Sequence, residues 1–141
     1  MISNDLKSVV EEIKKQGQMS FLNPTTAEKI DSFEKENQIT LPAEYREWLQ
    51  ISDGGEFFLP AGIQLYGVEH KPFIDANDDS RPDESYVVIG ALASGDPILF
   101  KKNNQEIAIY NIEANRIEDD EVYPDFISFL KNLADLLGIG D

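Results

Sequence analysis

The sequence predicts an α+β domain in which N-terminal helices and a C-terminal helix pack on a mainly antiparallel sheet. Apolar residues recur at helical spacing through the first third of the chain, alternate at strand spacing from about residue 56, and return to helical spacing after residue 124. Helices first, strands next and a closing helix are typical of this class. The length of 141 residues suits one domain, and no linker or repeat divides it, so we expect a single domain over residues 1–141.

Three helices are predicted in the first third of the chain. The first has four apolar residues on one face, which are Leu6, Val9, Val10 and Ile13. Gly17 is expected to end it. The second starts in residues 25–28, where a threonine hydroxyl and a glutamate three residues later can form a capping box. The third starts at Pro42, because proline is tolerated at the first helical position, and must end by the glycine pair 54–55.

Short strands separated by turn residues are predicted over residues 56–59, 63–66, 86–91, 98–100, 106–110 and 115–118. Their connections are too short for the crossover helices of a parallel sheet, so we expect an antiparallel meander. A last helix from about Pro124 is expected to end at Gly138. Its apolar face consists of Phe126, Phe129, Leu130, Leu133 and Leu137.

The charge of the chain is its compositional outlier. There are 27 acidic and 12 basic side chains, a formal net charge of −15. Nucleic acids and anionic membranes are therefore improbable ligands, because they bind proteins through lysine and arginine. Residues 1–50 carry a net charge of −3 and residues 51–141 a net charge of −12. Such a field favours a basic partner, although the same acidity would also keep an abundant protein soluble without any partner.

Other features of the composition indicate a cytoplasmic protein. No stretch approaches the roughly 20 apolar residues of a membrane span, and the N-terminus is polar where a signal peptide is apolar. The chain has no cysteine, which excludes a disulfide framework, a thiolate nucleophile and a cysteine-based metal site. We expect no cofactor and no membrane attachment.

The segment 71–85 is predicted to be a long exposed loop. It contains two prolines and five carboxylates, and loops of this length without their own structure are often binding elements or disordered. These carboxylates, our first choice of contact surface, are Asp75, Asp78, Asp79, Asp83 and Glu84. The second choice is a run of four acidic residues expected in turn-like surroundings, which are Glu118, Asp119, Asp120 and Glu121.

Catalytic and metal-binding patterns are weak in this chain. Asp75, Asn77 and Asp79 have the spacing that begins a calcium loop, but Ser80 stands where that loop needs glycine and Tyr86 where it needs glutamate. The single histidine, His70, cannot form a two-histidine metal centre. No phosphate-binding glycine motif or nucleophile elbow occurs. We therefore predict no catalytic residue and no metal site; a hydrolase with a metal at Asp78 and Asp79 is the enzymatic alternative.

The order of several weak motifs carries a family resemblance. The segment LPAEYREWLQISDGG resembles the hallmark of the SUKH superfamily, a Leu-Pro helix start, an aromatic, a hydrophobic pair and a closing Asn/Asp-Gly-Gly. The residues that carry it are Leu41, Pro42, Tyr45, Trp48, Leu49, Asp53, Gly54 and Gly55. The likeness continues through IQLYGVE, VVIGALASGDPILF and PDFISFLKNL, although Pro97 departs from the family pattern after its Gly-Asp turn.

The resemblance implies an α+β fold and a protein partner. The superfamily includes relatives of yeast cell-wall-assembly regulators and many bacterial immunity proteins that neutralise polymorphic toxins, often nucleases. An acidic domain can block a nuclease by occupying its basic, phosphate-accepting cleft. The expected function is therefore neutralisation of a cognate toxin with a basic domain through an acidic surface. A regulatory or scaffold module of the cell-wall-assembly-regulator type is the alternative.

Overall fold

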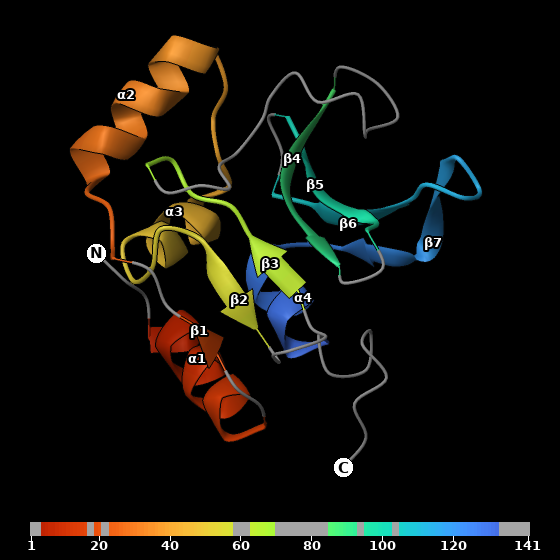
Figure 1. Cartoon of the computed structure of the whole chain (residues 1–141), viewed down its shortest axis with the longest axis horizontal. Coiled ribbons are helices and arrows are strands. Elements are labelled where there is room, and N and C mark those ends of the chain that lie inside the picture. Colours follow the sequence, from red (N-terminus) through yellow and green to blue (C-terminus); the bar gives the residue numbers. More distant parts are fainter. Residues whose placement is uncertain are drawn as a thin grey trace.

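A computed structural model, shown in Figure 1, describes residues 4–16, 19–20, 23–57, 63–69, 85–92, 95–102 and 105–132. Within these ranges, only the backbone is described for residues 16, 19, 20, 57 and 118–121. The described elements are four helices and seven strands, which confirms the predicted α+β class. In Figure 1, α1, α2 and α3 lie on the left, and strands β4 to β7 lie on the right.

Helices α1 and α2 precede the other described helices along the chain. Helix α1 spans Asn4–Gln16 and buries the four apolar residues of its predicted face. Helix α2 spans Ala27–Asn37. Its N-cap is Thr26, whose side-chain oxygen accepts a hydrogen bond from the Lys29 amide at 3.2 Å. The predicted capping box is therefore wrong in detail. Thr25 lies outside the helix, and its hydroxyl donates a hydrogen bond to Glu69.

Helices α3 and α4 are short, and each buries its apolar residues. Helix α3 spans Ala43–Leu49, with Pro42 at its N-cap, and buries Tyr45, Trp48 and Leu49 completely. Helix α4 spans Phe126–Lys131, and its N-cap Asp125 accepts a hydrogen bond from the Ser128 amide at 2.7 Å. The predicted continuation of this last helix to Gly138 lies outside the described residues.

The seven strands form one meander. They are β1 (Met19–Ser20), β2 (Gly55–Phe57), β3 (Ile63–Leu65), β4 (Tyr86–Leu92), β5 (Pro97–Lys101), β6 (Ile107–Asn111) and β7 (Arg116–Tyr123). Each strand pairs antiparallel with the next along the chain, in the order β1 to β7. The predicted antiparallel meander is therefore confirmed, and β1 and β7 stand at its two edges.

Strand β7 differs most from the prediction. It runs to Tyr123, whereas a strand over residues 115–118 was expected, so the acidic run 118–121 lies inside a strand and not in a turn. Its pairing with β6 is irregular: Ala108 pairs with Val122, but Tyr110 pairs with Ile117. Between these paired positions, β6 has one residue, Ile109, whereas β7 has four, the acidic residues 118–121.

Helices and sheet share one hydrophobic core. Alternate residues of the central strands face it, including Val87, Ile89, Ile98 and Phe100, together with the apolar faces of α1, α3 and α4. Three residues at intervening positions of β4, β5 and β6 are cross-strand neighbours and are buried as well, namely Val88, Leu99 and Ala108. Both faces of the central strands are therefore covered, which explains why these strands read as nearly continuous apolar runs.

Candidate functional site

The first predicted contact surface lies outside the described residues. This applies to Asp75, Asp78, Asp79, Asp83 and Glu84, and also to His70. What the structure does describe is the chain immediately before this segment, up to Glu69, and the chain immediately after it, from Ser85. The amide of Lys102 donates a hydrogen bond to the carbonyl of Ser85 at 2.7 Å, which ties the second of these points to the end of β5.

The second predicted surface lies on the last strand of the described sheet. Residues 118–121 belong to β7, which pairs with β6 on one side and is the last strand in the sheet order. The irregular register opposite β6 locally interrupts the ladder at these four residues. Residues 118–121 are therefore the one predicted surface whose backbone the structure describes.

A buried carboxylate holds the chain just before residue 70. Asp53 is fully buried. One of its carboxylate oxygens accepts a hydrogen bond from the amide of Val68 at 2.7 Å, and the other accepts one from the amide of Glu69 at 2.8 Å. These two hydrogen bonds fix the backbone after β3 against the segment that follows α3.

Two glycines make this close approach possible. A Cβ built on Gly67 would lie 2.2 Å from the carbonyl oxygen of Asp53, and one built on Gly54 would lie 2.6 Å from the carbonyl oxygen of Leu65. Gly54 also has a φ of 102°, a conformation that residues with side chains rarely adopt. Its carbonyl accepts hydrogen bonds from the indole nitrogen of Trp48 at 3.0 Å and from the hydroxyl of Ser52 at 2.9 Å.

The side chain of Glu69 extends the contact to α2. Its Oε2 accepts a hydrogen bond from the Thr25 hydroxyl at 2.9 Å, and its Oε1 pairs with the Lys29 ammonium at 2.8 Å. The hydrogen bond and the charge of Glu69 raise the pKa of Lys29. We call the unit formed by Asp53, Gly54, Gly67, Val68 and Glu69 the Asp53 joint.

Tyr45 supports the joint from the core. Its hydroxyl donates to the carbonyl of Tyr66 and lies 3.2 Å from the carbonyl of Ile89, and its ring meets Phe126 edge to face at a centroid distance of 5.1 Å. Burial raises the pKa of Tyr45 well above its ordinary value, so the phenol is neutral at physiological pH. The polar groups of Tyr45 and Asp53 therefore bind the main chain and position it.

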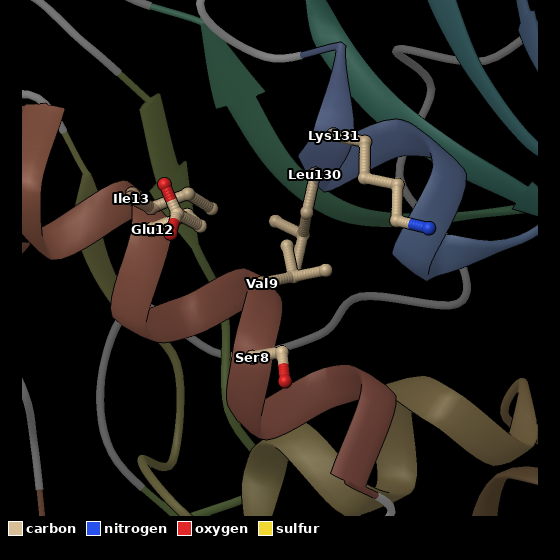
Figure 2. Close-up of a pocket in the computed structure, with 6 residues that line it drawn as sticks. All are labelled: Ser8, Val9, Glu12, Ile13, Leu130 and Lys131. Carbon is tan, nitrogen blue, oxygen red and sulfur yellow. The ribbon is translucent and has the colours of Figure 1, made fainter.

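A groove of about 340 Å³ lies between α1 and α4 (Figure 2). It is lined by Ser8, Val9, Glu12, Ile13, Leu130 and Lys131. Figure 2 shows the side chains of Val9 and Leu130 pointing toward one another across it. Its floor is apolar and its rim carries one acidic and one basic residue, so it has no strong charge of its own.

No group of three or more histidine, aspartate or glutamate side chains is placed to hold a metal ion among the described residues. No helix in the described ranges is long and apolar enough to cross a membrane.

Sequence reasoning missed the role of the joint. Gly54 of the hallmark segment and Gly67 were the visible signals, since each marks a place where backbones approach closely. The partners of Asp53 are 15 and 16 residues away along the chain, and the hydroxyl of Thr25 reaches a carboxylate 44 residues away. No local pattern in the sequence indicates such long-range contacts.

The comparisons with known proteins agree with this architecture. The model of the SMI1/KNR4 family (SUKH-1) matches residues 24–132. The matched range begins just before α2, includes the Asp53 joint and ends after α4, whereas α1 and β1 precede it. The comparison with curated proteins finds no match.

Proposed function

The chain belongs to the SMI1/KNR4 family (SUKH-1), and from this membership we propose that it is an immunity protein that binds and neutralises a cognate polymorphic toxin in the cytoplasm. Family membership supports the coarser statement, a protein-binding role. The toxin is the finer proposal. We assign no catalytic residue to the chain.

The observation that carries this proposal is the charge asymmetry within a domain of this family. Residues 51–141 have a net charge of −12, and they contain both predicted contact surfaces. A toxin that acts on nucleic acid presents a basic cleft, and an acidic domain can occupy it in place of the substrate. Attraction between such surfaces speeds encounter and weakens with added salt, so the complex should form more slowly at high ionic strength.

A regulatory or scaffold module is the second candidate. The same family membership supports it, because a protein-binding role does not specify the partner. The two candidates differ in what they bind: an immunity protein recognises a toxin encoded beside it, whereas a scaffold recognises a cellular protein whose loss has no connection with toxicity.

Co-expression tests the proposal. The chain is produced together with the toxin domain encoded by the adjacent gene, and growth and complex formation are measured. We expect restored growth and a stoichiometric complex. Absence of both would overturn the toxin proposal, and purification of a complex with a cellular protein in its place would favour the scaffold.

Amide variants test the two surfaces. In one variant the acidic residues 118–121 become Asn or Gln, and in another the five acidic residues of the 71–85 segment are changed likewise. The control changes four exposed glutamates of α1 and α2 to Gln, which alters the net charge as much as the first variant does. These control positions are Glu11, Glu12, Glu28 and Glu36. Equal loss of affinity in all three variants would show that only net charge matters and would reject both surfaces.

A further inference from the structure

We propose that helix α2 opens as one unit while the rest of the described domain stays folded, and that Arg46 of α3 is the main polar contact that keeps it closed. Of the eleven residues of α2, only Ile30 is buried. Helix α3 buries three of its seven residues, and α4 buries four of its six. Burial of apolar surface is the dominant stabilising contribution, so α2 is the helix that the core holds least. This inference concerns the free protein and does not depend on the proposed function.

Arg46 joins the middle of α2 to α3. Its guanidinium donates a hydrogen bond to the carboxylate of Asp31, and a second guanidinium nitrogen lies 3.9 Å from the carboxylate of Glu34. Glu34 also accepts a hydrogen bond from the amide of Leu41 at 2.7 Å, which ties α2 to the chain before α3. The side chain of Asp31 is 65% exposed, and ion pairs in contact with water contribute little to stability. A helix held by such contacts can separate from its neighbours while the core stays intact.

The closed position of α2 leaves one donor of Arg46 unpaired. The Nε atom of this side chain is buried and has no hydrogen-bond partner among the described residues. A buried donor without a partner raises the free energy of the closed position, whereas water can reach the same atom once α2 moves away. The closed and open positions therefore differ less in free energy than the ion pairs of Arg46 alone would give.

Buried residues on either side of α2 define the ends of the moving unit. Before the helix, Thr25 is buried, and its amide donates a hydrogen bond to a carbonyl of α3 at 3.0 Å. After the helix, Gln38 has a φ of 56°, which is uncommon for a residue with a side chain, and Ile39 belongs to the core. Between these points, Lys29 pairs with Glu69 at 2.8 Å, but its side chain is 58% exposed. The chain is thus anchored at Thr25 and Ile39, and α2 moves between them.

Amide hydrogen exchange in the free protein tests the opening. After correction for intrinsic rates, the amides of residues 31–37 should exchange with one common opening free energy, about a hundredfold faster or more than those of β5. Arg46→Gln should accelerate exchange in α2 by about threefold or more, because both ion pairs of Arg46 are lost. The control Lys15→Gln makes the same charge change and breaks an exposed ion pair with Glu12 within α1, so it should leave exchange in α2 within about twofold of wild type.

A core variant separates opening of α2 from unfolding of the whole domain. Leu130 is 2% exposed and faces α1 across the groove in Figure 2. Leu130→Ala should accelerate exchange in β5 by about tenfold or more, because it removes buried apolar volume. The contacts of Leu130 with α1 persist when only α2 opens, so exchange in α2 should stay within about twofold of wild type. Asp31→Asn breaks the contact with Arg46 from its exposed side and replaces Arg46→Gln if that variant does not fold.

Three outcomes would overturn the proposal. Equal acceleration of exchange in α2 and β5 by Leu130→Ala would show that α2 exchanges only when the whole domain unfolds. Widely different opening free energies among residues 31–37 would show that the helix frays residue by residue and does not move as one unit. Unchanged exchange in α2 of Arg46→Gln would refute the role of Arg46. A common opening free energy that responds to Arg46→Gln but not to Leu130→Ala would support both parts of the proposal.

Discussion

Trp48 is the largest side chain that is completely buried, and its removal should be the most costly single change in the core. Trp48→Ala loses the packing of the whole indole, which costs about 3–5 kcal/mol for a buried aromatic residue. The hydrogen bond from its indole nitrogen to the Gly54 carbonyl is lost as well. That carbonyl keeps the Ser52 hydroxyl as a donor, so no acceptor is left without a partner and no further penalty is expected.

Trp48→Phe separates packing from hydrogen bonding. It retains an aromatic ring but loses the donor and some volume, so it should cost about 1–2 kcal/mol. Because Trp48 is the only tryptophan, the unfolding of all variants is followed by circular dichroism in urea. Trp48→Ala should lower the urea midpoint by about 2 M at an ordinary slope. Ile112→Ala is the control, since Ile112 is 45% exposed and its loss should change stability by less than about 0.5 kcal/mol. A cost below about 1 kcal/mol for Trp48→Ala, or equal costs for the two Trp48 variants, would refute this reasoning.

Three further predictions concern the close approach at Gly67 and the charged side chains of Glu44 and Glu69. Gly67→Ala should destabilise the protein in urea by about 2 kcal/mol or more, because the new Cβ would lie 2.2 Å from the carbonyl oxygen of Asp53. Gly95→Ala is the control: Gly95 has a φ of 97° and lies in open space, so its substitution should cost only about 1 kcal/mol. Equal costs would contradict the close approach at Gly67. Burial raises the pKa of Glu44, so the charged carboxylate destabilises the fold above that pKa. Glu44→Gln should therefore be at least as stable as wild type at pH 7, and this advantage should shrink as the pH falls through the pKa of Glu44. A variant that is less stable than wild type at pH 7 would contradict the direction of the pKa shift. Glu69→Gln should lower the pKa of Lys29 toward its ordinary value, as measured in an NMR titration. In the wild type, the ion pair between Lys29 and Glu69 should stop stabilising the fold as the pH rises above the ordinary lysine range. An unchanged pKa of Lys29 in Glu69→Gln would show that the ion pair does not persist in solution.

Local patterns were sufficient to predict most of the fold. The apolar spacing of Tyr45, Trp48 and Leu49 predicted a buried face, and all three are fully buried. Turn residues between short apolar runs predicted the meander, because antiparallel neighbours need only short connections. These features depend on residues close to one another in the chain, which a single sequence displays directly.

The features that escaped prediction depend on distant partners. Four consecutive acidic residues have low strand propensity, yet residues 118–121 belong to β7, because pairing of the flanking residues with β6 outweighs local preference. Thr25 has the local signature of a helix cap, but its hydroxyl bonds to Glu69. The candidate site is predictable only in part for the same reason: the acidic composition is visible in the sequence, whereas the contacts that hold Asp53 are not.

The two ends of the sheet have a consequence for the behaviour of the protein at high concentration. An open strand edge can recruit another chain and so seed ordered aggregation. Here one edge is a strand of only two residues, and the other combines an irregular register with four consecutive acidic residues. An incoming strand would have to match that irregular ladder and bring enough positive charge to offset the acidic run. We therefore expect these edges of the described sheet to discourage pairing between copies of the chain.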